Sequence, residues 1–404
     1  MIAKISAGND CYSRGVNSPK SMPKEMMAAT PPKVPALPLA GVTVLDSTSN
    51  IAGPFGGAIL ADLGAEVIKI ETPLTDASRL MSPTEGDRSA YFHIVNRNKS
   101  SITIDLKSDA GRARFDDLLD SADVFLTNFL PERLASLRLA PADLMAKRPR
   151  LIFGNLSSYG SEGPASKFPG YDATVQARTG IMHVTGEANG DPVRVGVSVL
   201  DVGSGMWLAM GILAALYKRE QTGLGSVIET SLYETGVMWV SYHLSAFQVT
   251  GEASIRSGSG HPAFAPYGLF QARDGQIMIG VGNNQIFARL CNVIGRSELI
   301  EDSRFKENVD RVRNNVALKV EIERALAARD GQDWVTLLGD NAIPSDQVVK
   351  PEALFSDPQA SAVDILIDYP DPESKVRKIP GLPIKIDGVR PQVRKVAPHQ
   401  DKSG

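Results

Sequence analysis

The sequence predicts an α/β protein with two parts: a large domain on a doubly wound, mostly parallel sheet of the Rossmann type, and a smaller α+β domain. Short apolar runs alternate with helix-like segments through the first half of the chain, which is typical of a parallel sheet. After Ser231, helix-like segments lead into a stretch rich in glycine, serine and proline. The 404 residues suffice for two domains. We expect a flexible arm over residues 1–38, the large domain over 39–234, the small domain over 235–345 and a return segment to the large domain over 346–404.

The first elements form a βαβ unit. Val42–Asp46 is a short apolar strand, and Pro54 suits the first turn of a helix that runs to Leu63. Gly64 ends this helix, and Glu66–Glu71 is the second strand. Two strands joined by a single helix imply parallel pairing.

The same patterns place the later elements. Further strands are expected at Ser101–Asp105, Asp123–Thr127, Leu151–Leu156 and Gly275–Val281. Helices are expected at Gly111–Ala122, Met206–Arg219, Tyr233–Thr250, Ile286–Ile294, Asn314–Arg329 and Trp334–Leu338.

The composition argues against several classes of function. A net charge of −3 gives no reason to expect a nucleic-acid or membrane partner, and no apolar run reaches the length of about 18 residues that spans a bilayer. Two cysteines and five scattered histidines predict no disulfide framework and no metal site. The first 38 residues are basic and end in a proline-rich run, so cytoplasm and mitochondrial matrix both stay open as locations.

Common nucleotide and hydrolase motifs are missing. Gly53–Gly57 follows the first strand, but it does not match the Gly-x-Gly-x-x-Gly pattern of dinucleotide sites. The sequence has neither a Walker loop nor a Gly-x-Ser-x-Gly elbow. A carboxylate nucleophile therefore remains a serious candidate.

Two aspartates stand in suitable surroundings. Asp201 ends a short apolar run and precedes small residues and a predicted helix, so we expect it at a strand-to-helix junction near free backbone N–H groups. Asp172 follows Gly170 and Tyr171. Either acid alone is more often a turn or cap residue. By the same reasoning other candidates are first of all solvated charges, turns or loops: Lys107, Asn128-Phe129, Gly258–Pro262, Arg178 and Arg194.

A long series of motifs resembles the family III CoA-transferases, the CaiB/BaiF group that includes formyl-CoA:oxalate and carnitine CoA-transferases and α-methylacyl-CoA racemase. The resemblance covers residues 41–390. The motifs are Ala61–Glu71, Tyr91-Phe92, Asn96–Lys99, Ser101–Lys107, Ala122–Val124, Asn128-Phe129, Pro149–Ile152, Gly170–Asp172, Gln176-Ala177, Thr185-Gly186 and Asp201. Three further stretches, Gly180–Gly186, Asn189–Arg194 and Val281–Gln285, resemble the succinyl-CoA:glutarate branch.

The resemblance implies roles for the two acids. Asp201 corresponds to the nucleophile of the family, and Asp172 to an acid beside it. The racemases carry a proton-carrying histidine immediately before this second acid. Here that residue is Tyr171, which favours transfer over racemisation.

The resemblance also implies the contacts to CoA. They map onto Ile51, Ala52, Ile104, Lys107, Asn128, Phe129 and Tyr171. Thr72 and Ser136 stand where relatives often carry arginine. Lys99, Arg97 or Arg133 would then have to supply the missing contacts to the CoA phosphates.

The implied reaction moves CoA from an acyl-CoA, expected to be succinyl-CoA, to a dicarboxylic acid such as glutarate, itaconate, mesaconate or citramalate. It proceeds through an aspartyl anhydride and an aspartyl-CoA thioester, with no metal. Gly258 and Gly260 would form a lid that keeps water from Asp201. Arg178 or Arg194 would bind the distal carboxylate of the acceptor.

N–H groups near Gly203 and Gly205, or in the lid, would stabilise the oxyanion. The family further implies an interlocked homodimer. Two alternatives stay open: an acyl-CoA racemase or epimerase of the same superfamily, and a CoA-binding protein without catalytic activity.

Overall fold

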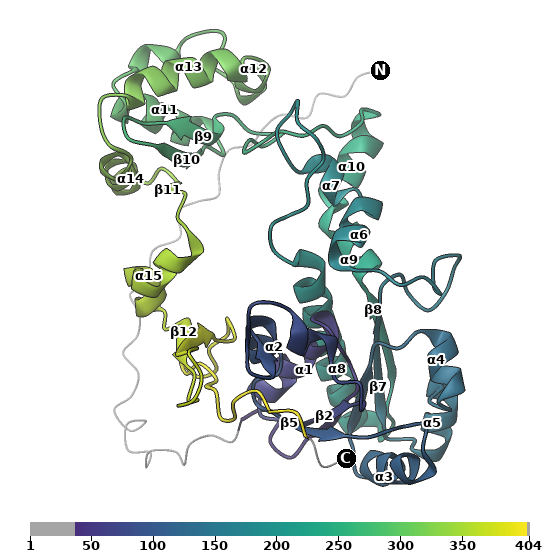
Figure 1. Ribbon diagram of the computed structural model, residues 1–404. Helices are drawn as coiled ribbons and strands as arrows, with labels where there is room; N and C mark the ends of the chain where they lie inside the picture. The colour runs from purple at the N-terminus through teal and green to yellow at the C-terminus, as the bar shows by residue number, and fades with distance from the viewer. Residues whose placement is uncertain (1–36, 402–404) are drawn as a thin grey trace, which may run out of the picture. The chain divides into compact units, whose positions relative to one another are not determined.

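The computed structural model describes residues 37–401 (Figure 1). The predicted flexible arm, residues 1–38, therefore lies outside the described residues except for its last two. The elements below all belong to the compact unit that begins at Pro38.

A six-stranded parallel sheet forms the centre of the large α/β part, as the alternating pattern predicts. Its strands run in the order β5-β2-β1-β6-β7-β8, and every neighbouring pair is parallel. They are β1 (Thr43–Asp46), β2 (Glu66–Glu71), β5 (Lys99–Thr103), β6 (Val124–Thr127), β7 (Ile152–Ser157) and β8 (Val227–Ser231). From β1 the chain builds outward to β2 and β5, then returns to build β6, β7 and β8 on the other side. The direction of winding thus reverses between β1 and β6.

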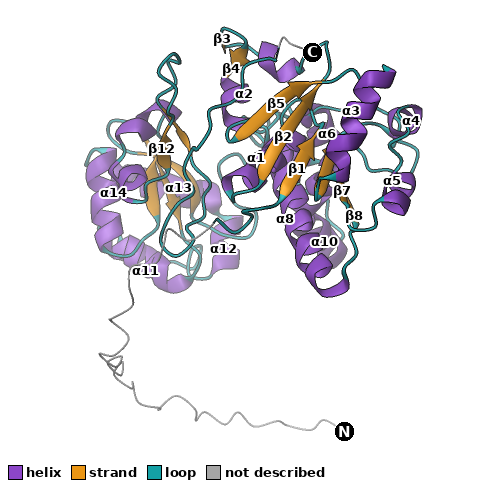
Figure 2. Cartoon of the chain, turned by 90° about the horizontal axis from the view of Figure 1, so that it is seen from below, coloured by secondary structure: helices purple, strands orange, loops and turns teal. Residues whose placement is uncertain are grey.

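Helices cover both faces of this sheet (Figure 2). Successive strand residues point to opposite faces, so Val44 packs in one core and Leu45 in the other. The core on the face of Val44 includes residues of α1 (Ala52–Asp62) and α8 (Val199–Thr222). The opposite core includes residues of α3 (Asp109–Asp120), α4 (Pro131–Ser136) and α5 (Pro141–Lys147).

Helix α8 is long and apolar enough to cross a membrane by length and composition alone, with a mean hydropathy of 1.7 over its most apolar window. This corrects the expectation that no segment would pass that test. In the structure Leu200, Leu208 and Ile212 of this helix are fully buried against α1 and the sheet. The helix is therefore a core element of the described unit.

Glycines bring α1 and α8 into close contact. A Cβ atom at Gly205 would lie 2.5 Å from the carbonyl oxygen of Ala52, and one at Gly56 would lie 2.9 Å from the carbonyl oxygen of Gly205. Such distances allow no side chain, so the two helix axes can approach only because both residues lack one. This contact places the beginning of α1 beside the beginning of α8.

Smaller elements complete the first part. They are β3 (Thr84–Glu85), β4 (Arg88–Ser89), α2 (Ala90–Val95), α6 (Asp172–Arg178), α7 (Ile181–Val184), α9 (Leu232–Trp239), α10 (Ser241–Thr250) and the 3-10 turn η2 (Ala77–Leu80). The predicted helix Tyr233–Thr250 is thus two helices. Leu232 and Val240, at the ends of α9, pack in the same core as α8.

A second core lies between residues 270 and 343 (green in Figure 1). Its antiparallel sheet has the order β11-β10-β9. The strands are β9 (Tyr267–Gln271), β10 (Gln276–Gly280) and β11 (Ser345–Gln347). The helices are α11 (Asn284–Val293), α12 (Asn308–Arg313), α13 (Asn315–Leu326), α14 (Gly331–Asp340) and the 3-10 turn η3 (Ser297–Ile300).

The last segment contacts the first part of the chain. It contains η4 (Pro351–Ser356), α15 (Pro358–Ala362), β12 (Leu366–Asp368) and β13 (Lys378–Pro380). The Asn98 side chain accepts hydrogen bonds from the N–H groups of Arg394 and Lys395. Arg88 pairs with Asp371 at 2.7 Å. These contacts hold the C-terminal segment against α2 and the edge of the large sheet.

Candidate active site

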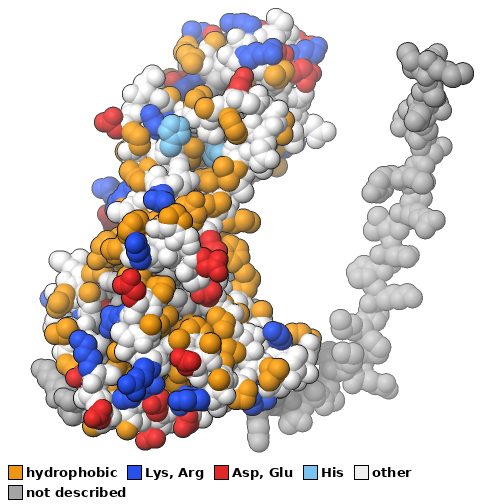
Figure 3. Space-filling model, turned by 90° about the vertical axis from the view of Figure 1, so that its right-hand side faces the viewer, with side chains coloured by type: hydrophobic (Ala, Val, Ile, Leu, Met, Phe, Trp, Pro, Cys, Tyr) orange, Lys and Arg blue, Asp and Glu red, His pale blue; other side chains and the backbone are white. Residues whose placement is uncertain are grey.

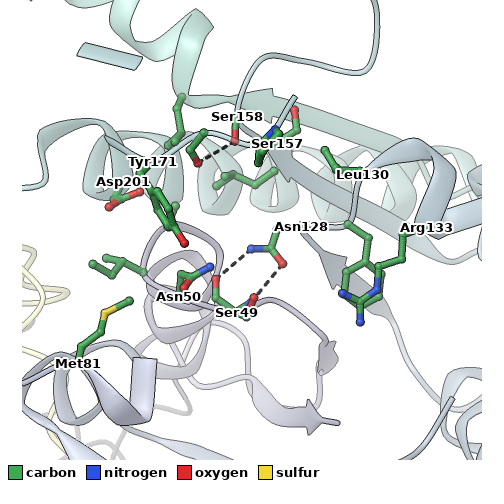
Figure 4. Close-up of a pocket in the computed structure, with 17 residues that line it drawn as sticks. Ser49, Asn50, Met81, Asn128, Leu130, Arg133, Ser157, Ser158, Tyr171 and Asp201 are labelled. Atoms are coloured by element: carbon green, nitrogen blue, oxygen red, sulfur yellow. Dashed lines mark hydrogen bonds between the residues drawn. The ribbon is translucent and has the colours of Figure 1, made fainter. Parts of the chain in front are cut away.

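A cavity of about 330 Å³ opens where the winding of the sheet reverses (Figure 4). It is lined by Ser49, Asn50, Ile51, Ala52, Met81, Asn128, Phe129, Leu130, Arg133, Leu156, Ser157, Ser158, Pro169, Gly170, Tyr171, Asp201 and Leu232. Most of these residues follow the carboxyl ends of β1, β6 and β7. Open α/β sheets bind ligands at this position because the chain leaves neighbouring strands in opposite directions and so opens a crevice.

Two loops are joined across this crevice. The Asn128 side chain accepts a hydrogen bond from the N–H of Ser49 at 3.2 Å and donates one to the Ser49 carbonyl at 3.0 Å. Both bonds are drawn in Figure 4. Asn50 adopts a left-handed conformation, with φ of 67°, and so turns the loop toward α1. The loops after β1 and β6 therefore form one fixed wall of the cavity.

Asp201 lies in the first turn of α8 and reaches the cavity from the opposite wall (Figure 4). The expectation of a strand before it is wrong, since residues 191–198 form no strand. Val199 and Leu200, the apolar residues directly before Asp201, already belong to the first turn of α8. Asp201 therefore belongs to a helix, and its position depends on the contacts that fix the first turn of α8.

Asp172 fixes the first turn of α8. Its Oδ2 accepts hydrogen bonds from the N–H of Leu200 at 2.7 Å and of Asp201 at 3.2 Å, while Gln176 donates to its Oδ1 at 2.5 Å. A carboxylate that takes N–H groups of the first turn caps a helix and offsets its positive end. The capping residue comes from α6, so Asp172 fixes Asp201 across two helices.

Burial raises the pKa of Asp201 to about 7, and the negative charge of Asp172 adds to this effect. An ordinary aspartate loses its proton near pH 4. Asp201 is therefore partly protonated at neutral pH in the free protein. The ionised form has an uncompensated charge, which makes it a reactive base or nucleophile.

Gly203 and Gly205 do not supply an oxyanion site. Both lie inside α8 and are buried, where N–H groups bond within the helix. The start of α1 brings N–H groups to this cavity, since Ile51 and Ala52 line it. Its N-cap Ile51 makes no side-chain capping bond, and its first turn has no acid. This helix start gives the cavity a partial positive charge.

A second cavity of about 170 Å³ adjoins the first. Both are lined by Ser49, Phe129 and Arg133. The second extends toward the carboxyl end of β2, where Lys69, Glu71 and Asp76 line it. An elongated ligand can therefore lie along the crevice from Asp201 toward β2.

Lys99 does not line either cavity, which corrects its prediction as a CoA contact. It is fully buried and donates to Asp46 at 2.8 Å. A Cβ at Gly57 would lie 2.5 Å from Asp46 Oδ2, so a glycine makes room for the pair. Asp46 also accepts from the N–H of Thr48, at the start of the loop that lines the cavity. Lys99 thus stabilises that loop through Asp46.

Several other candidates lie elsewhere. Arg97 is buried and paired with Asp62, and Ile104 and Lys107 line neither cavity. Arg178 lies over the ring of Tyr159, at 5.4 Å, and Arg194 donates to the carbonyls of Val195 and Gly196. The prediction that an arginine at 178 or 194 binds a distal carboxylate in the cavity of Asp201 is therefore not met in this chain.

The predicted lid also lies apart from Asp201 in this chain. Gly258 and Gly260 line a small cavity of about 120 Å³ with Glu187 and Lys319. Arg256 donates to the carbonyls of His183, Glu187 and Gly190, which attaches the glycine loop to the loop after α7. The loop does not line the cavity of Asp201 in the described part of the chain.

Ile51, Ala52, Asn128, Phe129, Tyr171 and Asp201 do meet in one cavity, as predicted. Asp172 lies directly behind it. Four polar lining residues were not predicted: Ser49, Asn50, Ser157 and Ser158. All four lie at or just after the ends of the predicted strands Val42–Asp46 and Leu151–Leu156, so the strand ends were the available signal.

Comparison with known proteins decides the family. The model of CoA-transferase family III matches residues 39–402. The chain belongs to CoA-transferase family III. It is 39% identical to the acetyl-CoA:oxalate CoA-transferase of Acetobacter aceti, covering 94% of this chain and 97% of that protein. It is 34% identical to the human succinyl-CoA:glutarate CoA-transferase, covering 85% of this chain and 79% of that protein.

Solved structures of the family share the fold. A CAIB/BAIF family protein from Brucella suis superimposes with a TM-score of 0.79 at 32% identity, covering 90% of this chain and 96% of that one. The Mycobacterium tuberculosis protein Rv3272 superimposes with a TM-score of 0.81, also at 32% identity, covering 90% and 97%. This family III enzyme thus has its candidate nucleophile in a cavity of a fold that its relatives share.

Proposed function

We propose that this family III enzyme moves CoA from an acyl-CoA, with succinyl-CoA as the expected donor, to a dicarboxylic acid. The observation that carries the proposal is Asp201: a carboxylate with a pKa raised to about 7, fixed by Asp172 and open to the crevice of the sheet. Similar proteins are named for oxalate, glutarate and mesaconate as acids.

The chemistry follows from the carboxylate. Ionised Asp201 attacks the thioester carbonyl, and CoA leaves as a thiolate, so that a mixed anhydride forms. The thiolate then attacks the Asp201 carbonyl, which gives an aspartyl-CoA thioester and releases the donor acid. The acceptor carboxylate attacks this thioester to form a second anhydride. The thiolate finally attacks the acceptor carbonyl, which yields the new acyl-CoA and restores Asp201.

Two features of the cavity favour this sequence. Each attack places negative charge on a carbonyl oxygen, and the uncapped start of α1 offers N–H groups and a partial positive charge at the same cavity. Among the described residues no histidine lines the cavity, and Tyr171 occupies the place of a proton-carrying histidine. The lining therefore suits transfer better than removal of an α-proton.

We propose a homodimer as the working form. Helix α10 has no buried residue, and apolar side chains of α8, α9 and α10 are exposed: Met206 and Met210 at 51%, Met238 at 56% and Phe247 at 54%. Figure 3 shows apolar side chains exposed on the face that it presents. An apolar surface of this kind supports burial against a second copy, and a second copy could also bring a glycine loop to Asp201.

The test is a panel of acids with one donor. The purified protein is incubated with succinyl-CoA or acetyl-CoA and one of oxalate, glutarate, mesaconate, itaconate or citramalate, and the thioesters are identified by mass spectrometry. A new dicarboxyl-CoA is the expected product. Exchange of the α-proton of a branched acyl-CoA with deuterium in the absence of any acid would instead establish the racemase. CoA binding with neither reaction would establish the non-catalytic alternative.

A further inference from the structure

Among the described residues, Arg133 is the one charge shared by the two adjoining cavities, and it has no ionic partner there. The first cavity is lined by two charged residues, Arg133 and Asp201, and the second by Lys69, Glu71, Asp76 and Arg133. Lys69 pairs with Asp76 at 2.6 Å and Glu71 with Arg79 at 2.6 Å. Within residues 37–401, no ion pair or hydrogen bond is formed by the guanidinium of Arg133.

The guanidinium is nevertheless held in place. It lies over the ring of Phe129, with 4.0 Å between the guanidinium carbon and the ring centroid. Such stacking is favourable and leaves the edges of the guanidinium free to donate. Arg133 follows Pro131 in the first turn of α4, so its backbone is fixed as well. The result is a positioned donor at the wall of the crevice (Figure 4).

The CoA part of the ligand implied by the proposed function carries its charges on phosphates, away from the thioester. Acyl-CoA is a long molecule with a thioester at one end and phosphates near the nucleotide at the other. The thioester must reach Asp201, in the first cavity. The phosphates must then lie farther along the crevice, where the two cavities join at Arg133.

We propose that Arg133 binds a phosphate of CoA and is the principal cation for this part of the ligand. The proposal rests on the proposed function. A guanidinium forms paired, charge-assisted hydrogen bonds with phosphate oxygens, which suits a free arginine better than a paired lysine.

The other basic candidates are already engaged. Lys99 is fully buried on Asp46, and Arg97 is buried on Asp62. Thr72, which also lines the second cavity, carries no charge. Arg133 is therefore the unpaired cation that the described lining offers to a phosphate, and specificity for CoA over shorter thioesters depends on it.

The experiment separates the phosphate end from the thioester end. Rates are measured with an acyl-CoA and with the matching acyl-pantetheine, which has the same thioester and no nucleotide. Binding of CoA and of adenosine 3′,5′-bisphosphate, which has no thiol, is measured by calorimetry at low and moderate salt. The variants are Arg133→Ala and Arg133→Lys, with Arg138→Ala as control, because Arg138 is exposed and lines neither cavity.

We expect Arg133→Ala to weaken binding of CoA and of the bisphosphate by about 10- to 100-fold, as is usual for a hydrogen-bonded charge. The KM for acyl-CoA rises by a similar factor, kcat changes little, and the rate with acyl-pantetheine stays within about twofold of wild type. Arg133→Lys recovers part of the loss, and Arg138→Ala changes neither reaction.

Unchanged bisphosphate binding in Arg133→Ala would overturn the proposal, as would equal losses with both thioesters. A wild-type protein that binds CoA but transfers it to no acid would contradict the proposed function while leaving the assignment of Arg133 open to the binding measurement.

Discussion

Two sets of charged side chains meet at the carboxyl ends of β1, β2 and β6, and they differ in whether the charges are paired. Beneath the loop after β1, Lys99 pairs with Asp46 and Lys69 with Asp76, all of them buried. In the crevice above, Asp201 and Arg133 face open space and have no ionic partner within residues 37–401. Paired charges satisfy one another and fix the backbone, whereas unpaired charges remain available to a ligand. In this molecule, burial alone therefore does not distinguish a functional charge from a structural one. The absence of an ionic partner is what marks Asp201 and Arg133.

The largest effect should come from the unpaired acid. Asp201→Asn keeps the size of the side chain but removes the nucleophile, so transfer should fall by about 10³-fold or more. CoA binding should persist, because the rest of the cavity is unchanged. Steady-state rates and calorimetry measure the two quantities. Asp117→Asn, at an exposed position of α3, is the matched control and should be fully active. A variant at 201 that turns over normally would refute covalent catalysis.

The paired set should behave in the opposite way. Lys99→Met leaves Asp46 as a buried charge without a partner, which should cost about 3–5 kcal/mol of unfolding free energy. Lys107→Met, at a position that lines neither cavity, should cost almost nothing. Denaturant unfolding measures both. If Lys99→Met were as stable as wild type but had a raised KM for acyl-CoA, then Lys99 would be a ligand contact after all.

The raised pKa of Asp201 also carries a cost in stability. Because the folded pKa, about 7, lies above the ordinary value, the unfolded chain loses this proton first, and wild type loses stability as pH rises from about 4 to 7. Asp201→Asn does not titrate. Its unfolding free energy should therefore match that of wild type at pH 4 and exceed it by about 4 kcal/mol at pH 8. A gain that is the same at both pH values would show that Asp201 does not have a raised pKa.

The smallest expected effect concerns the acid that caps α8. Asp172→Asn keeps an oxygen for the N–H groups of Leu200 and Asp201 but removes the negative charge. The pH at which kcat/KM for the donor reaches half its maximum, near 7 in wild type, should fall. Asp172→Ala should also lose about 1 kcal/mol of stability with the cap. If the profile of Asp172→Asn does not move, Asp172 has only a structural role.

The parts of this molecule that could be predicted from the sequence are those with a clear local pattern of apolar residues. The strand Glu66–Glu71 is largely buried and coincides with β2, whereas β8 is polar and half exposed at the sheet edge and was missed. Asp201 and the lining residues Ile51, Ala52, Asn128, Phe129 and Tyr171 were predicted through the family motifs.

The surroundings of Asp201 and Lys99 depend on partners that are distant in sequence. The cap of Asp201 comes from Asp172, 29 residues away, and the partner of Lys99 is 53 residues away. No local pattern reports such pairing, so Lys99 could not be distinguished from a ligand contact.

Oxygen tracing tests the central claim that Asp201 carries the acyl group. The enzyme is allowed to turn over with an acyl-CoA and an acceptor acid labelled with ¹⁸O in its carboxylates, and the peptide that contains Asp201 is then analysed by mass spectrometry. In the proposed sequence the acceptor oxygen bridges the second anhydride and stays with the enzyme when the thiolate attacks the acceptor carbonyl. We predict that label enters the Asp201 carboxylate, at one oxygen for each turnover. Rapid formation of the new acyl-CoA with no ¹⁸O in that peptide would contradict this role of Asp201.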